Sequence, residues 1–162
     1  EVHRTMAAFM ADTPVSFTAP ATGPYRFSLN AGNNRAQIAA PSHPMALAIE
    51  DRPVGLSRSG GRLIFHVPPG TTQFGVRVAG QGTGEGIKAT LLDPQGEVFG
   101  RVDNQFGTHQ FEVNLDPPSA GEVWALVLAG PSELTWDDHS VDLRGIPPLL
   151  SAAGTVPLAP VQ

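Results

Sequence analysis

The sequence predicts an all-β fold, an antiparallel sandwich or barrel of short strands. Glycine and proline supply 18 and 16 of the 162 residues, about a fifth of the chain where roughly 12% is usual. Both residues destabilise helix interiors, so this composition disfavours a helix bundle. Apolar residues recur with a period of two far more often than with a helical period. Turn sequences separate these segments at intervals of about 8–14 residues, which is typical of a sandwich or barrel.

The alternating segments define the expected strands in chain order. In the segment 24–30, Tyr25, Phe27 and Leu29 share one face, and we expect that face to point inward. The segment 122–128 is apolar on both faces, as in a central strand. The expected strands cover residues 15–18, 24–30, 35–38, 45–49, 62–67, 74–78, 87–91, 97–99, 111–115, 122–128 and 136–143.

Proline and glycine mark the breaks between these strands. The sequence Asp93-Pro94-Gln95-Gly96 predicts a tight β-turn that joins the strands on either side of it. The glycine-rich segment 80–86 invites a phosphate-binding interpretation, but such a loop must open a helix, and the residues that follow have strand character. We therefore expect a hairpin loop there.

The ends of the chain differ from its middle. We expect an N-terminal arm over residues 1–14, a β-sandwich domain over 15–148, and a tail or linker rich in proline and alanine over 149–162. The chain begins with Glu1, without an initiator methionine or a signal-peptide pattern. We interpret it as a processed piece of a longer protein.

The charge balance argues against two classes of partner. The chain has 10 basic and 15 acidic residues, a net charge of −5, and Lys88 is its only lysine. No basic stripe is available to neutralise phosphates, so we expect neither a nucleic acid nor an anionic membrane surface as a partner. No apolar run is long enough to span a bilayer. The absence of cysteine excludes disulfides, thiolate ligands and cysteine nucleophiles.

The residues that could catalyse a reaction are not arranged to do so. No serine lies in a Gly-x-Ser-x-Gly sequence. Asp137 and Asp138 are adjacent on an expected strand, so their side chains point to opposite faces and cannot flank one bond. The five histidines are scattered, and none is spaced for metal binding. We predict a protein that is not an enzyme and needs no cofactor.

Two groups of residues are candidates for sugar binding. Trp136, Asp138 and His139 place an aromatic ring beside polar groups, which suits stacking on a sugar together with hydrogen bonds to its hydroxyls. The alternative is that Trp136 fills the core at the start of a strand. The second group lies in the polar segment 101–109, which we expect to be a loop, and consists of Arg101, Asp103, Asn104 and Phe106.

The alternative for the second group is an ordinary solvated loop. Tyr25 is a further aromatic residue that a sugar-binding surface would expose. Asn33 and Asn34 lie in a polar turn that offers side-chain and backbone oxygens to Ca²⁺, but it supplies only neutral ligands, and a plain turn is the alternative.

From Gly61 onward, over about 90 residues, the sequence resembles a domain found in large secreted bacterial polysaccharide-degrading proteins. The resemblance is carried by strand and turn sequences such as Leu63-Ile64-Phe65-His66-Val67-Pro68-Pro69-Gly70-Thr71, Leu92-Asp93-Pro94-Gln95-Gly96, Gly121-Glu122-Val123-Trp124 and Val141-Asp142-Leu143-Arg144-Gly145-Ile146-Pro147-Pro148. It implies a galactose-binding-like fold, an antiparallel jelly-roll β-sandwich of two sheets.

The resemblance also implies a function. Many such domains are non-catalytic carbohydrate-binding modules, covalently linked to a catalytic domain that acts on a polysaccharide outside the cell. Others are structural domains that pack against a catalytic domain and bind no sugar. The shared motifs describe strands and turns, so they identify no ligand-binding residue.

Overall fold

The computed structural model describes residues 16, 18–29, 42–49 and 51–152. The chain divides into two compact units, Glu1–Ile38 and Ala39–Gln162. The described residues contain no helix, and therefore none with the length and apolarity that a membrane crossing requires.

In the first unit, the expected strand over residues 24–30 is wrong. Residues 24–29 belong to no strand, and Tyr25, Phe27 and Leu29 are all about half exposed. The Tyr25 hydroxyl instead donates to the Ala21 carbonyl at 2.6 Å and accepts from the Ala21 amide at 3.1 Å. Alternation of apolar residues forms a strand only where another strand pairs with it. The expected strand 35–38 lies outside the described residues, as does most of 15–18, whose described residues, 16 and 18, are not in a strand.

The described residues of the second unit form ten strands. Every strand expected from residue 45 onward has a counterpart, and two strands were not expected, β2 and β10. The strands are β1 (Ala46–Ala48), β2 (Val54–Ser57), β3 (Gly61–Val67), β4 (Gln73–Gly80), β5 (Ile87–Leu92), β6 (Val98–Gln105), β7 (Gly107–Asn114), β8 (Glu122–Ala129), β9 (Asp138–Arg144) and β10 (Leu149–Ala152).

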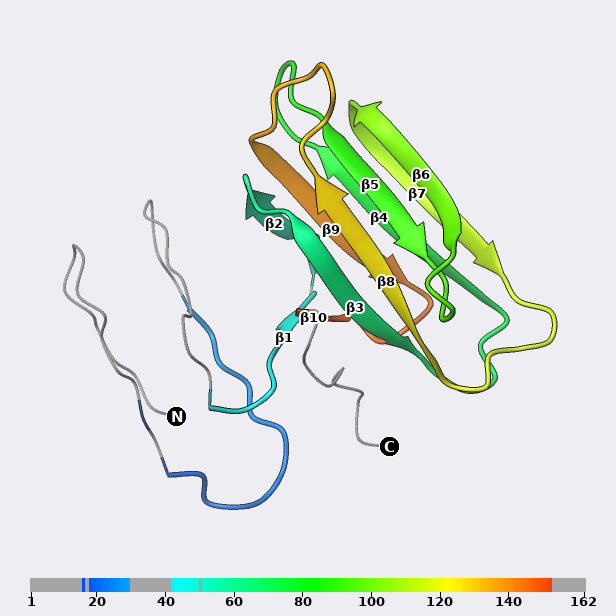
Figure 1. The fold of residues 1–162 in the computed structure, drawn as a ribbon. Coiled ribbons are helices and arrows are strands. Elements are labelled where there is room, and N and C mark those ends of the chain that lie inside the picture. The colour runs from blue at the N-terminus through cyan, green and yellow to red at the C-terminus, as the bar shows by residue number, and fades with distance from the viewer. Residues whose placement is uncertain (1–15, 17, 30–41, 50, 153–162) are drawn as a thin grey trace. The chain divides into compact units, whose positions relative to one another are not determined.

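These strands form two antiparallel sheets that pack face to face (Figure 1). The six-stranded sheet has the order β1-β10-β3-β8-β5-β6, and the four-stranded sheet has the order β2-β9-β4-β7. The all-β sandwich of two sheets is therefore confirmed. Every connection between successive strands passes from one sheet to the other, except that between β5 and β6. This alternation between sheets is the path of a jelly roll, to which the β5–β6 hairpin adds two strands at one edge.

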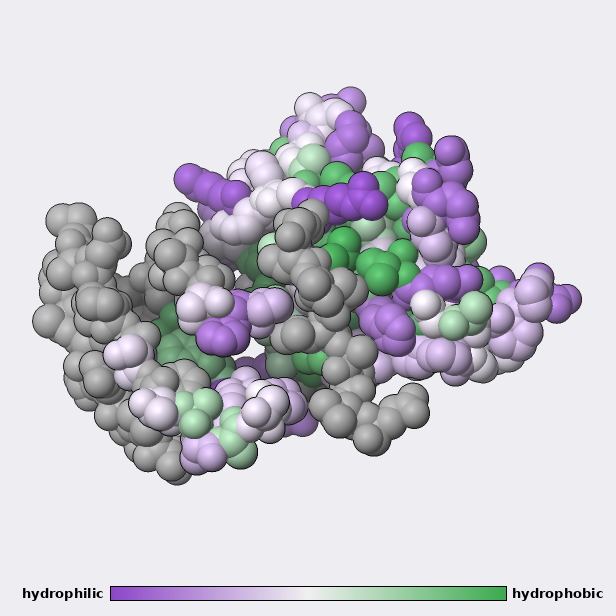
Figure 2. Space-filling model, turned by 60° about the horizontal axis from the view of Figure 1, so that its bottom comes forward, coloured by the Kyte–Doolittle hydropathy of each residue, from purple (hydrophilic) through white to green (hydrophobic). Residues whose placement is uncertain are grey.

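The core lies between the two sheets. Each strand turns one row of side chains inward, and aromatic rings from both sheets meet there edge to face. Phe74 of the four-stranded sheet has its ring centre 6.0 Å from Phe65 and 5.1 Å from Trp124, both of the six-stranded sheet. Hydrophilic residues cover most of the described surface on the side drawn in Figure 2, and the apolar residues visible there lie between them.

The connections follow from local chemistry. The tight turn at Asp93-Pro94-Gln95-Gly96 is confirmed, because the Gly96 amide donates to the Asp93 carbonyl at 3.0 Å and the Asp93 side chain accepts from the Gln95 and Glu97 amides. The segment 80–86 is not a hairpin loop. It leads from β4 in one sheet to β5 in the other. The polar segment 101–109 is not a loop either, since Phe106 alone separates β6 from β7.

The segment 149–162 was expected to be a tail, and its first four residues contradict this. They form β10, which pairs with β1 on one side and with β3 on the other. Leu150 is 1% exposed within the core. The strand is short and carries no clear alternation, which explains why the sequence did not reveal it.

The position of β10 is testable by removing its buried side chain. Leu150→Ala should lower the free energy of unfolding by about 2–5 kcal/mol, the usual cost of a buried leucine. Leu47→Ala, at the residue paired with Leu150 but 45% exposed, is the matched control and should cost much less. Urea denaturation measures both, and equal losses would contradict the placement of β10 in the core.

Candidate functional site

Trp136 packs against backbone at the end of the sandwich where β8 leads to β9. Its ring lies so close to two glycines that a Cβ at Gly60 or Gly130 would be 2.8 or 2.9 Å from it. The ring is half-buried, and its Nε1 is buried without a hydrogen-bond partner among the described residues. Trp136 therefore fills space between connections and does not present an open face for stacking on a sugar.

His139 is fully buried beneath Trp136, so it cannot touch a ligand. Its ring centre lies 6.0 Å from that of Trp136. Its Nδ1 is 3.1 Å from the Asp137 carbonyl oxygen, and its Nε2 is 2.9 Å from the Ser59 carbonyl oxygen. Trp136, Asp138 and His139 therefore do not form one binding surface, because Asp138 is exposed and His139 is buried.

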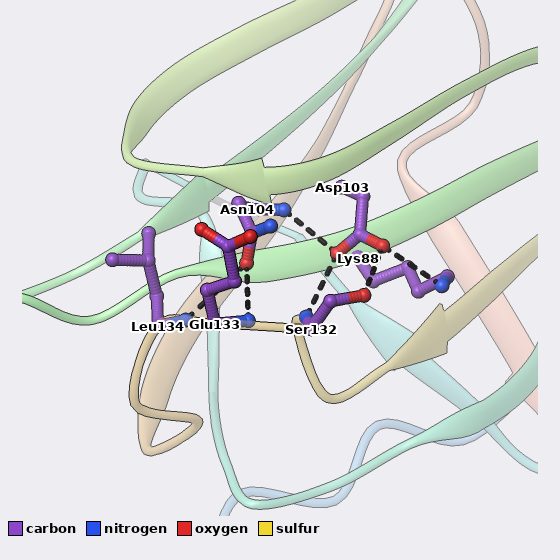
Figure 3. Close-up of polar contacts among 6 residues, drawn as sticks. All are labelled: Lys88, Asp103, Asn104, Ser132, Glu133 and Leu134. Carbon is purple, nitrogen blue, oxygen red and sulfur yellow. Dashed lines mark hydrogen bonds and ion pairs between the residues drawn. The ribbon is translucent and has the colours of Figure 1, made fainter.

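Asp103 and Asn104 bind the connection between β8 and β9 (Figure 3). The Asp103 carboxylate accepts from Lys88 Nζ at 2.8 Å and from the Ser132 hydroxyl at 2.6 Å, and also from the Ser132 amide. The Asn104 side-chain oxygen accepts from the Glu133 and Leu134 amides at 2.7 and 3.2 Å. We call these contacts the loop clasp.

The backbone conformation of β6 directs the Asp103 and Asn104 side chains toward the β8–β9 connection. The pairing of β6 with β5 shifts register between Ile87 and Ala89, and Asn104 has a positive φ of 53°. Such a bulge redirects side chains away from the regular strand alternation. The hydrogen bond from Lys88, followed by that from Ser132, holds the pKa of Asp103 well below its ordinary range. Asp103 and Asn104 therefore stabilise the connection between β8 and β9 with their side chains.

The remaining predicted residues do not form a single cluster. Arg101 is exposed on the outer side of the six-stranded sheet, opposite Thr90. Phe106 is 59% exposed at the turn between β6 and β7. Tyr25 belongs to the other unit, and Asn33 and Asn34 lie outside the described residues. Among the residues that the structure describes, no group of three histidines or acidic residues could hold a metal ion.

A different set of polar residues gathers on the outer side of the four-stranded sheet. Inward residues of β4 such as Val76 and Val78 are buried, so the alternate residues face outward. The register places Arg77 between Asp142 and Gln110, Ala79 between Ser140 and Thr108, and Gly75 between Arg144 and Glu112. We call these nine residues the polar face. Of the predicted site residues in the described part of the chain, only Asp138 lies on the same side of the four-stranded sheet as the polar face.

An ion-pair cluster lies at the centre of the polar face. The Asp142 side chain is only 7% exposed, and its Oδ2 lies 2.5 Å from Arg144 Nη2 and 3.9 Å from Arg77 Nη1. Neither contact has hydrogen-bond geometry, so Oδ2 is buried with ion-pair partners only. Among the described residues, the Arg77 guanidinium makes no hydrogen bond, and neither do the hydroxyls of Ser140 and Thr108. Arg77 and Thr108 are accessible to a ligand, whereas Ser140 is only 4% exposed at the floor of the face.

The polar face is hollowed beside this cluster. A hollow of about 30 Å³ is lined by Pro53, Arg77, Val78, Ala79, Thr108, Ser140 and Asp142, and its lining is mainly apolar. A broader surface hollow of about 370 Å³ lies at residues 51–54 and Ala48, and the two share Pro53. Small residues in the middle of the sheet leave room for the first hollow, and the polar residues Arg77, Thr108, Ser140 and Asp142 are part of its rim.

The outer side of the six-stranded sheet has the opposite character. Its outward residues on β3, β5, β6 and β8 include an apolar set outside the core between the sheets, beside polar residues such as Thr90 and Arg101. We call this apolar set the apolar face. It consists of Ile64, Leu92, Val98, Val123, Ala125 and Val127, of which Ile64 and Ala125 are buried and the others are partly or fully exposed.

The sequence analysis missed the polar face because its residues come from three strands far apart in the chain. Each of them, taken alone, has the pattern of an ordinary solvent-facing position. The available signal was the small outward residues Gly75 and Ala79 beside Arg77. Comparisons of the chain with protein-family models, curated proteins and solved structures found no match. The geometry therefore carries the functional argument.

The loop clasp predicts a pH dependence of stability. Because the pKa of Asp103 is lower in the folded than in the unfolded state, its ionised form stabilises the fold above about pH 4, and this contribution declines as pH falls further. Asp103→Asn should therefore destabilise the protein at neutral pH and less so near pH 3, measured by urea denaturation. Asp138→Asn is the control. If the loss of unfolding free energy in Asp103→Asn were the same at neutral pH and near pH 3, the loop clasp would be contradicted.

The packing of Trp136 gives a second prediction for this end of the sandwich. Trp136→Ala should cost about 2–4 kcal/mol of unfolding free energy, since it leaves a cavity between glycines that cannot fill it. Trp136→Phe should cost less than half as much, because a ring remains and the indole N–H has no partner to lose. Thermal unfolding would refute this if both variants were equally destabilised.

Proposed function

We propose that this domain is a non-catalytic carbohydrate-binding module and that the polar face binds the sugar. The observation that supports the proposal is the hollow in that face, which has a mainly apolar lining and to which Arg77, Thr108 and Ser140 all contribute. The Arg77 guanidinium and the two hydroxyls make no side-chain hydrogen bond among the described residues. Sugar hydroxyls both donate and accept hydrogen bonds, and these groups supply partners for both roles.

The shape of the polar face favours a polymer over a small molecule. Pockets that enclose small ligands usually measure about 300–1,000 Å³, whereas the hollow beside Arg77 measures about 30 Å³. One substituent of a sugar ring fits there while the ring remains on the sheet surface. The adjoining hollow across Pro53 extends the surface along which a chain of sugars would lie.

Such a site would act by tethering. In this proposal the domain belongs to a longer, secreted bacterial protein whose linked catalytic domain degrades the bound polysaccharide. Binding raises the effective concentration of that catalytic domain at its substrate without contributing to the reaction.

The apolar face favours a second function, that of a structural domain. Exposed apolar residues such as Val98 and Val123 suit contact with another protein surface, and a linked catalytic domain is a partner of that kind. The two functions use opposite sides of the sandwich, so one domain can have both.

Sugar binding at the polar face is tested by filling its hollow. Ala79→Gln places a longer side chain between Ser140 and Thr108, and should weaken retention on a bound polysaccharide at least about tenfold, the effect of losing one or two well-placed hydrogen bonds. Thr90→Gln adds a side chain of the same kind to the other sheet and should have no effect. Affinity electrophoresis against plant, algal and fungal polysaccharides provides the measurement.

Two results would count against the proposal. Retention on none of the polysaccharides would leave only the structural function. Equal retention of the Ala79→Gln variant and the unmodified protein would place the sugar site elsewhere on the domain.

A further inference from the structure

From the charges around the hollow, we infer that the bound sugar carries a carboxylate, so that the ligand is an acidic polysaccharide. This inference rests on the proposed function and specifies the ligand class of the same site. Its basis is an arginine whose guanidinium pairs with Asp142 only at 3.9 Å and donates no hydrogen bond among the described residues.

Arg77 is the residue that would bind the carboxylate. It lines the hollow, its side chain is 38% exposed, and its guanidinium makes no hydrogen bond among the described residues. A guanidinium presents parallel N–H donors that match the two oxygens of a carboxylate. The flanking Ser140 and Thr108 hydroxyls can donate to the same group or to a neighbouring hydroxyl.

The Asp142 carboxylate pairs more closely with Arg144 than with Arg77, so it does not use the Arg77 hydrogen-bond donors. Arg144 Nη2 lies 2.5 Å from Asp142 Oδ2, whereas Arg77 Nη1 is 3.9 Å away, beyond hydrogen-bond distance. Two guanidiniums around one carboxylate leave a positive charge beside the hollow. Asp142 is therefore a positioning residue that fixes the two arginines.

The polar face as a whole carries two arginines and two carboxylates, so its formal charges cancel and the positive charge beside the hollow is local to the Arg77 guanidinium. Glu112 on β7 accepts a hydrogen bond from Gln110 at 3.2 Å and lies across Gly75 from Arg144, away from Arg77 in the strand register. On the β1–β2 connection, Asp51 and Arg52 offset one another beside the second hollow. Asp138 lies at the far end of β9, paired in register with Ser57.

The size of the hollow supports recognition of one substituent. A volume of about 30 Å³ exceeds the roughly 10–15 Å³ that one water molecule needs but is far below the roughly 300–1,000 Å³ of small-ligand pockets, so a carboxylate group can enter and a sugar ring cannot. The net charge of −5 opposes the approach of a polyanion, but at physiological salt this repulsion is screened beyond about 8 Å. The short-range contact with Arg77 then determines whether an acidic polysaccharide binds more tightly than a neutral one.

The test compares sugars that differ only in charge. Polygalacturonate and alginate are each assayed beside their methyl esters, which keep the rings and linkages but lack the negative charge. We expect at least one acid to bind at least about tenfold tighter than its ester, since charge-assisted hydrogen bonds are about twice as strong as neutral ones. Its affinity should fall with added salt, and that of the ester should not.

Variants assign the effect to Arg77. Arg77→Gln should reduce affinity for the acid to that for the ester, whereas Arg101→Gln, a surface arginine on the other sheet, should leave it within about twofold. Arg77→Lys keeps the charge without the paired donors and should lose part of the affinity, about three- to tenfold. If Arg77→Gln does not fold, as judged by thermal unfolding, Arg77→Lys provides the comparison.

The outcomes separate this inference from the proposed function. Equal binding of acid and ester, binding of neutral polysaccharides alone, or acid binding that does not depend on Arg77 would overturn the inference and leave a sugar-binding module. Retention on no polysaccharide, acidic or neutral, would overturn the proposed function and the inference with it.

Discussion

Burial of one row of side chains from every strand between the two sheets is the interaction on which the rest of this structure depends. The chain alternates between the sheets, so strands adjacent in sequence contribute to opposite walls of one core, where Phe65, Phe74 and Trp124 meet. Burial of these aromatic rings supplies much of the stabilisation that such a core provides. Fixing the inward rows also fixes the outward rows, and the polar and apolar faces follow from that constraint.

Most of the polar side chains that resemble binding residues in the sequence hold the connections at one end of the sandwich. Lys88, the only lysine, binds Asp103, and Asn104 binds two amides of the next connection. Buried or strand-end backbone groups need such partners where no strand pairs with them. Arg77 differs because its only charged partner among the described residues, Asp142, lies 3.9 Å away and leaves its N–H donors unused. That distinction separates a side chain that serves the fold from one available to a ligand.

The sequence predicted the fold class and most of the strands after residue 45, because alternation and proline or glycine turns are local signals. It was misled at residues 24–30, where Tyr25, Phe27 and Leu29 alternate without a pairing strand. It did not reveal β2, which is only four residues long, so the alternation of Val54 and Leu56 with Gly55 and Ser57 is too short a signal. Residues 101–109 suggested a loop because their outward side chains are polar. The polar face could not be predicted, since sheet order brings Arg77, Thr108 and Ser140 together.

The central claim is that ligand binding takes place on the polar face. Its most direct test is a titration of isotope-labelled protein with oligogalacturonides, followed residue by residue through backbone amide chemical shifts. The account predicts that the largest changes occur at Arg77, Ala79, Thr108 and Ser140, with little change at Phe106, Arg101 or Trp136. Changes centred on Phe106 or on the loop clasp, with the polar face unaffected, would contradict it.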